Sequence, residues 1–346
     1  YDVRVGVSAL ANGSDIVFHE LLDERGARRH VMLPFEADRF RELSVVRDDD
    51  PSWGTRFDDL FERAFETGEA AHHVLAAGGI GYEFGNRVID GRALMLADQI
   101  GADVLRVAVY DGGAGRGAGG TSSVVEQWRR SPADGPVEVI SPRKLPGVSV
   151  PDEPDDPSSE PGDPDDVGVM AMLFADAKGF SSLDEVQNLA FVRDFLGAVR
   201  ELLDSGYDEH VFHKNTWGDG LFFVFTDVEQ AGRFALDLRD IPETHRERFD
   251  AAGIGHIRFR VALHAGPARI VVNPISGERQ ISGTQISRAA RTEPATPVGQ
   301  VYASEPFAAL SRAYRRPGAD VTEGARGYAC RYVGRIDLAK GFGRFP

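Results

Sequence analysis

Two aspartates stand beside strongly apolar, strand-like runs of the sequence. Asp176 lies in "LFADAKGFSSL" and Asp219 lies in "NTWGDGLFFVF". If the two strands are neighbours, the carboxylates converge, and adjacent carboxylates repel each other unless a positive charge lies between them. Hard oxygen ligands with open positions for water and phosphate are what Mg²⁺ or Mn²⁺ prefers. The pattern therefore predicts two divalent ions that stabilise a triphosphate during in-line displacement.

Each acid also has an ordinary structural explanation. Asp176 could cap the helix that follows it, and Asp219 could be a simple turn residue, since Asp219-Gly220 suits a hairpin turn with positive φ. For either acid alone we would favour that explanation. Because both occur together, and because "KGFSS" supplies backbone amides just after Asp176, we favour the metal hypothesis.

The elements that must position the two acids follow each other in residues 167–346. The pattern indicates a strand, a helix, a hairpin, a helix and a strand, followed by a further helix and the strand "QVYAS". The order βαββαβ predicts a ferredoxin-like arrangement, in which the end of the first strand lies beside the central hairpin turn. Trp217, inside the hairpin, could narrow a pocket or belong to the core, and we favour the core.

Four segments of this half resemble, in order, the motifs of the class III nucleotidyl cyclases, the adenylate and guanylate cyclase family. They are "LFADAKGFSSL", "NTWGDGLFFVF", "RVALHAGPA" and "GTQISRAART...VGQVYAS". The resemblance implies that Asp176 and Asp219 hold two metal ions, with the carbonyl of Ala177 as an additional ligand. Arg291 matches the family's transition-state arginine. Lys340 matches its phosphate-binding lysine, which lies near the C-terminal end of the domain. A guanidinium suits a phosphoryl group whose charge is shifting.

The resemblance further implies that Gly179, Phe180 and Ser181 contact the substrate. It also implies that the metal acids come from one copy of the chain, while the arginine and the base-reading residues come from another. A homodimer would then contain two sites. The expected reaction is the conversion of a nucleoside triphosphate to a 3′,5′-cyclic mononucleotide and pyrophosphate. No side chain is an obvious general base. A dedicated base is unnecessary, because metal coordination would lower the pKa of the attacking hydroxyl.

Three positions depart from the family pattern and bear on the choice of substrate. Ser287 replaces the asparagine that orients the ribose, Asn215 replaces the base-reading lysine, and Gln280 replaces the base-reading aspartate. Two amides can each donate and accept hydrogen bonds, which makes GTP less favoured and leaves adenine and pyrimidines open. ATP is our first choice. The alternatives are a UTP or CTP cyclase, as in relatives that serve in bacterial antiphage signalling, and a catalytically weak nucleotide-sensing module.

Residues 1–141 alternate between strands and helices, which predicts a Rossmann-like parallel sheet covered by helices. The Gly-rich turns "ALANGSD", with Gly13, Ser14 and Asp15, and "DGGAGRGAGGT" each follow a strand and precede a helix. They could bind an anionic ligand through bare amides, or be mobile surface loops. Residues 8–35 loosely resemble the Rossmann-like nucleotide-ligand family of the DprA and LOG proteins. The resemblance implies a ligand-sensing domain, and we expect it to regulate the cyclase domain.

Residues 142–166 are rich in Pro, Asp, Glu and Ser, which predicts an extended acidic linker between an α/β domain (1–141) and an α+β domain (167–346). The formal net charge of −15 argues against non-specific nucleic-acid binding and against a polybasic membrane anchor. The single cysteine, Cys330, excludes an intrachain disulfide framework and cysteine-rich zinc sites. No apolar run could span a bilayer and no signal peptide is visible. We therefore expect a cytoplasmic protein.

The histidines are expected to be structural. His72 and His73 are adjacent, so on a helix they would point to different faces, and we do not expect a metal site there. His210, His213 and His264 lie at or in predicted strands. The sequence contains no HExxH signature.

Overall fold

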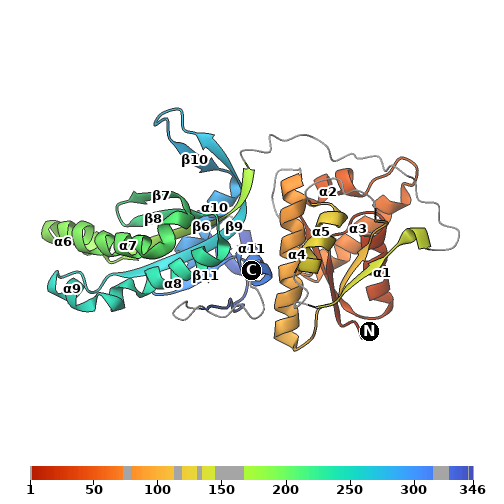
Figure 1. Cartoon of the computed structure of the whole chain (residues 1–346), viewed down its shortest axis with the longest axis horizontal. Helices are drawn as coiled ribbons and strands as arrows, with labels where there is room; N and C mark the ends of the chain where they lie inside the picture. The colour runs from red at the N-terminus through yellow and green to blue at the C-terminus, as the bar shows by residue number, and fades with distance from the viewer. Residues whose placement is uncertain are drawn as a thin grey trace. The chain divides into compact units, whose positions relative to one another are not determined.

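The structure is a computed structural model that describes residues 2–72, 79–112, 119–130, 135–144, 167–314, 327–341 and 343–345. Residue contacts divide the chain into two compact units, residues 1–165 and 166–346 (Figure 1). Of the expected linker, only the short 3₁₀ turn Pro142–Lys144 belongs to the described residues. The remainder of the linker prediction lies outside them.

The first unit contains parallel strands, as predicted. β1 (Val5–Ser8), β2 (Arg28–Leu33) and β3 (Ala70–His72) pair in parallel in this order. β4 (Arg106–Val109) and β5 (Val137–Ile140) form a separate parallel pair. The described strands therefore form two small sheets, whereas the sequence suggested one Rossmann-like sheet. The described helices of this unit are α1 (Ser14–Glu24), α2 (Ala37–Ser44), α3 (Ser52–Glu66), α4 (Gly79–Ile100) and α5 (Thr121–Arg130).

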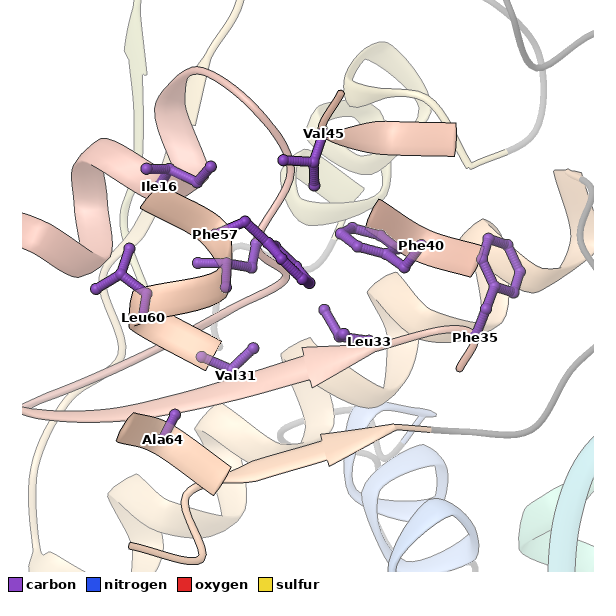
Figure 2. Close-up of a cluster of buried hydrophobic side chains, with 10 residues drawn as sticks. Ile16, Val31, Leu33, Phe35, Phe40, Val45, Phe57, Leu60 and Ala64 are labelled. Atoms are coloured by element: carbon purple, nitrogen blue, oxygen red, sulfur yellow. The ribbon is translucent and has the colours of Figure 1, made fainter. Parts of the chain in front are cut away.

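A core of aliphatic and aromatic side chains lies between α3 and β2 in this unit (Figure 2). Phe57, Leu60 and Ala64 of α3 are spaced three and four residues apart, so they lie on one face of the helix. That face packs against Val31 and Leu33 of β2. Burial of this stripe explains why the segment forms a helix here, since tertiary packing supplies most helix stability.

The second unit is built on a mixed sheet with the strand order β10-β9-β6-β8-β7. β11 pairs in parallel with β9, and the other neighbours are antiparallel. The strands of this sheet are β6 (Val167–Lys178), β7 (Val211–Trp217), β8 (Gly220–Phe225), β9 (Arg258–Val272), β10 (Arg279–Ser282) and β11 (Val301–Ala303). β12 (Ile336–Leu338) and β13 (Gly343–Phe345) form a separate antiparallel pair.

The described helices of this unit are α6 (Glu185–Ala190), α7 (Leu196–Leu202), α8 (Val228–Thr244), α9 (Arg246–Ala251), α10 (Thr284–Thr292) and α11 (Glu305–Tyr314). Of these, α8, α10 and α11 pack on the sheet, whereas α7 and α9 pack on α8 (Figure 1). π-helical segments, 191–195 and 203–207, adjoin α7 at either end.

The apolar run "LFFVF" is a strand buried on both faces. Phe223 and Phe225 contact Phe234 of α8, with ring centroids 5.1 and 5.2 Å apart. Phe222 and Val224, whose side chains alternate with these, belong to a cluster with Ala289 of α10. Continuous hydrophobicity in β8 therefore follows from helices on both sides of the sheet.

β10, α9, α11 and the β12–β13 pair were not predicted. The central order β9-β6-β8-β7 places β6 between β9 and the hairpin β7–β8, and this part of the expected βαββαβ layout is present. In the part of the chain that the structure describes, no helix combines the length and hydropathy needed to cross a bilayer. Cys330 is exposed.

Candidate functional site

The main chains at the two candidate metal-binding aspartates lie side by side. Asp176, near the end of β6, is opposite Gly220 of β8. The amide of Ala177 donates a hydrogen bond to the carbonyl of Asp219 at 3.1 Å. Both acids are half-buried. The register of β6 on the hairpin therefore brings together the residues that the sequence singled out.

The hairpin turn differs in detail from the prediction. Trp217 pairs with Gly220, so the two turn residues are Gly218 and Asp219. Gly218 has a φ of 63°, and Gly220 is an ordinary strand residue. The expectation of positive φ within Asp219-Gly220 is therefore wrong. A hairpin turn with positive φ at its first central residue favours glycine there, because glycine has no Cβ to clash.

Trp217 is not a core residue, contrary to expectation. Its exposed fraction is 57%, and its ring stacks on Phe222 with centroids 6.3 Å apart. β7 is the edge strand of the sheet. The side chain at the end of an edge strand has no further strand to cover it.

The alternative that Asp176 caps the next helix is also wrong. Asp176 lies inside β6, which continues to Lys178. The N-cap of α6 is Asp184, whose Oδ1 accepts a hydrogen bond from the amide of Gln187 at 2.8 Å. Gln187 Oε1 in turn accepts from the amide of Asp184 at 3.0 Å, which completes a capping box. Asp176 is thus not needed for helix capping.

Charged side chains that the sequence did not single out surround Asp176. Its Oδ2 lies 3.2 Å from Lys178 Nζ and 3.3 Å from Arg260 Nε. Arg260 Nε also forms an ion pair with Glu293 Oε1. Lys178 is two residues along the same strand and so shares a face with Asp176, whereas Arg260 is its direct partner across β6–β9. Only the strand register could identify the second contact.

Burial raises the pKa of the Glu293 carboxyl. The positive charge of Arg260 lowers that pKa, and the negative charge of Asp176 raises it. Glu293 begins the 3₁₀ turn Glu293–Ala295, directly after α10. The cluster around Asp176 therefore contains two acids and two cations within a partly buried space.

The donors at this site fit a hard divalent ion. Oδ2 of Asp176 is buried without a hydrogen bond and lies 3.2 and 3.3 Å from the two cations. Within the described ranges, no group of three or more His, Cys, Asp and Glu side chains could hold a metal. The oxygens that could bind an ion at this site are those of the Asp176 and Asp219 carboxylates and the Ala177 carbonyl, and water or phosphate would supply the other ligands, as Mg²⁺ sites commonly require.

The segment after Asp176 forms a tight turn. Gly179 has a φ of 101° and precedes the 3₁₀ turn Phe180–Ser182. A Cβ at Gly179 would lie 2.9 Å from the ring of His256. Both the positive φ and this close approach therefore require glycine. Phe180 packs edge-on against Phe191, with centroids 4.8 Å apart. Ser181 is exposed. This packing fixes the turn beside the candidate acids.

The two predicted cationic groups lie near each other. Arg291, in the last turn of α10, donates from Nη1 to the carbonyl of Ala339 at 3.5 Å. The next residue, Lys340, is exposed and has φ 62° and ψ 32°. Among described residues it is the one non-glycine residue with positive φ. A lysine in this conformation is strained and invites a functional explanation.

The three predicted nucleoside-contacting residues lie on different elements. Ser287 is exposed on α10. Asn215 is exposed on β7, with its Oδ1 accepting from the amide of Thr216 at 2.8 Å. Gln280 lies on β10, and its Oε1 accepts from Asn273 Nδ2 at 3.1 Å.

β7 and β10 stand at opposite ends of the strand order, yet their side chains approach each other. The Arg279 guanidinium carbon lies 5.7 Å from the centroid of the Phe212 ring. The negative charge of Glu278 also raises the pKa of His213, although burial has the larger effect and lowers it. The strands that carry Asn215 and Gln280 therefore come close to each other.

His264 connects β9 to α10 and to the residue between β11 and α11. It is fully buried on β9, with Nδ1 2.6 Å from Ser304 Oγ and Nε2 2.7 Å from Gln285 Oε1. Burial, and to a smaller extent the positive charge of Arg288, lowers its pKa to about 3, although the Gln285 hydrogen bond raises it. His264 is therefore neutral at pH 7 and ties α10 to β9.

We expect His264 to make the second unit less stable in mild acid. Its folded pKa of about 3 lies below the ordinary value of 6.5, so the unfolded chain binds the proton more tightly. The contribution of neutral His264 to the free energy of unfolding is thus fully present above pH 6.5. It falls as the pH is lowered, by about 2 kcal/mol at pH 5. Urea unfolding at pH 7 and pH 5 should show a smaller pH dependence for His264→Gln than for the parent chain. Equal pH dependence in both proteins would contradict this role.

In the first unit, Gly13, Ser14 and Asp15 lie where β1 leads into α1. Gly13 has a φ of 85°, and α1 begins at Ser14. Asp15 Oδ2 accepts a hydrogen bond from the amide of Ala11 at 3.2 Å, and burial raises the Asp15 pKa to about 6. The second Gly-rich turn lies largely outside the described residues. His72 ends β3, and His73 lies outside the described residues.

No family model matches the chain, and no curated protein matches it. Solved structures to which it is similar are cyclases. The adenylyl cyclase CyaB from P. aeruginosa is 16% identical, with 52% of this chain and 91% of that chain covered and a TM-score of 0.42. The guanylate cyclase domain of RhGC from Catenaria anguillulae, in complex with GTP, is 18% identical (51% and 92% covered, TM-score 0.40). The guanylyl cyclase Cya2 is 15% identical (42% and 79% covered, TM-score 0.38). Likenesses of this size do not by themselves assign an activity to the chain.

Proposed function

We propose that residues 167–346 form a metal-dependent nucleotidyl cyclase that converts a nucleoside triphosphate, with ATP favoured, to a 3′,5′-cyclic mononucleotide and pyrophosphate. The observation that carries the proposal is the hydrogen bond from the Ala177 amide to the Asp219 carbonyl. It sets the main chains of two motif acids side by side at the end of β6. The motif resemblance supplies the reaction, and the proximity of the Arg291 guanidinium to the residue before Lys340 adds support.

In this reaction the ribose 3′-oxygen forms a bond to the α-phosphorus while the bond from that phosphorus to the bridging oxygen of pyrophosphate breaks. The proton of the hydroxyl passes to solvent. Asp176 and Asp219, with the Ala177 carbonyl, would hold the divalent ions. Bound ions lower the pKa of the hydroxyl and neutralise phosphate charge. Arg291 would donate to the α-phosphoryl oxygens as their charge shifts, and Lys340 would bind the outer phosphates.

The choice of base is proposed to depend on Asn215 and Gln280. Oxygens of both amides already accept hydrogen bonds within the chain, from Thr216 and from Asn273. Each oxygen keeps a second lone pair, so both amides can still donate to a base and accept from it. Adenine offers both an acceptor, N1, and a donor, the N6 amino group, so it stays the first choice, and the pyrimidine alternative stays open.

We expect Gln280→Ala to reduce discrimination between bases. A site that hydrogen-bonds its substrate loses specificity when the partner is removed, and kcat/KM for the preferred triphosphate should fall about tenfold. The value for the poorer triphosphates should change less. Ser282→Ala, an exposed position on the same strand, is the control and should leave the ratios unchanged. A uniform loss for all four triphosphates would contradict base reading by Gln280.

The activity itself is tested by incubating the full chain with ATP, GTP, CTP or UTP and either Mn²⁺ or Mg²⁺. Mass spectrometry then identifies any cyclic nucleotide. A cyclic product with release of pyrophosphate supports the proposal, and its identity gives the base preference. Nucleotide binding without any product would instead favour the sensing module. The homodimer, regulation by residues 1–141 and the DprA/LOG resemblance stay predictions.

A further inference from the structure

Arg260 lies between two carboxylates at the candidate metal site. Its Nε is 3.3 Å from Asp176 Oδ2 and pairs with Glu293 Oε1. Asp176 Oδ2, Arg260 Nε and Glu293 Oε1 are all buried, and no directed hydrogen bond fixes any of them. Arg260 Nη1 donates to the carbonyl of Pro294 at 3.4 Å. The guanidinium is thus anchored on the Glu293–Ala295 turn while its Nε also faces Asp176.

Two cations, Arg260 and Lys178, interact with Asp176, and the charge interaction with Arg260 is the stronger of the two. Its side chain is 17% exposed, compared with 43% for Lys178. Charge interactions of buried groups are less screened than those of exposed ones. A divalent ion on Asp176 would be repelled by a guanidinium held close to the same oxygen. Metal binding therefore requires another anion to hold Arg260.

We propose that Glu293 is a positioning residue that competes with Asp176 for Arg260, partly neutralises the guanidinium and so lets a divalent cation bind to Asp176. This inference rests on the proposed cyclase function, whose metal site it concerns. Glu293 is 14% exposed and receives the same Arg260 nitrogen that faces Asp176. Once a divalent cation is bound to Asp176, the Arg260 guanidinium stays bound to Glu293 and to the Pro294 carbonyl. It therefore needs no new partner.

Glu293→Gln is the test, with Mn²⁺ alone as the probe and no nucleotide present. Electron paramagnetic resonance of free Mn²⁺ gives the dissociation constant of the full chain without turnover. Without the Glu293 charge, Asp176 is the remaining carboxylate of this cluster that pairs with Arg260, so Arg260 competes more strongly with Mn²⁺ for it. We expect the dissociation constant to rise roughly five- to tenfold, the size of one partly buried charge interaction. Glu293→Asp, which keeps the charge, should recover most of the affinity.

A double-mutant cycle separates an effect through Arg260 from a simple loss of negative charge. Arg260→Gln should tighten Mn²⁺ binding, and Glu293→Gln in that background should weaken it only about twofold or less. Lys178→Gln is the matched control, because it removes the other cation beside Asp176. In that background Glu293→Gln should retain its full effect. Thermal unfolding of each variant checks that it folds.

The outcomes distinguish this inference from the proposed function. If the parent chain binds no Mn²⁺ that depends on Asp176, the metal site fails and the inference fails with it. If the parent chain binds Mn²⁺ and Glu293→Gln binds it equally well, only the positioning role is wrong. An equal loss in the parent and Arg260→Gln backgrounds would likewise show that Glu293 does not act through Arg260.

Discussion

Asp219→Ala is expected to abolish cyclic nucleotide formation, with a fall in kcat of about 10³-fold or more, because it removes one of two carboxylates that hold the divalent ions. Mn²⁺ binding in the absence of nucleotide should be lost in parallel. Asp219→Asn should give the same result, since an amide keeps the size of the side chain without its charge. The fold should survive, because the hydrogen bond to the Ala177 amide uses the main-chain carbonyl of Asp219.

A matched control is Asp227→Ala in the same unit. Asp227 caps α8, where its Oδ1 accepts hydrogen bonds from the amides of Glu229 and Gln230 at 2.8 and 3.0 Å. Loss of this cap should cost about 1 kcal/mol of stability and leave Mn²⁺ binding intact. Cyclic product and pyrophosphate are measured together by mass spectrometry and a phosphate assay. An Asp219→Ala chain that released pyrophosphate at the parental rate would remove the metal assignment.

A mixture of two inactive variants, Asp176→Asn and Arg291→Ala, is expected to regain about a quarter of the parental activity. If each site takes its acids from one copy and its arginine from the other, half of randomly mixed dimers are hybrids with one intact site of two. Each variant alone should be inactive, because every one of its sites carries the same defect. Activity is measured after the two proteins are mixed at equal concentration and allowed to exchange.

The control for complementation is a mixture of Arg291→Ala with Lys340→Ala. Both residues are proposed to serve the same side of the site, and the Arg291 guanidinium contacts the carbonyl of the residue before Lys340. Hybrids of these two variants have no complete site, so activity should not return. If hybrid dimers form and neither mixture recovers activity, the shared site is wrong. Recovery in both mixtures would also contradict it.

Much of the second unit could be predicted because its signals are local. β6, the hairpin β7–β8, α8, β9 and α10 are all present in the expected order. Continuous apolar runs predict strands buried on both faces, and the hairpin is marked by its Gly-Asp-Gly turn. In the first unit, α4 was missed because its many glycines lower helix propensity, although tertiary packing still forms the helix.

The sequence by itself determined which side chains are available: two acids at strand ends, an arginine and a lysine near later motifs, and amides where a base would be read. Only the tertiary structure decided that Ala177 hydrogen-bonds to Asp219, that Trp217 is exposed, and that Arg260 lies between Asp176 and Glu293. The reason is that spacing along one strand fixes which residues share a face, whereas contacts between strands depend on register. Register is set by packing of the whole sheet rather than by any one segment.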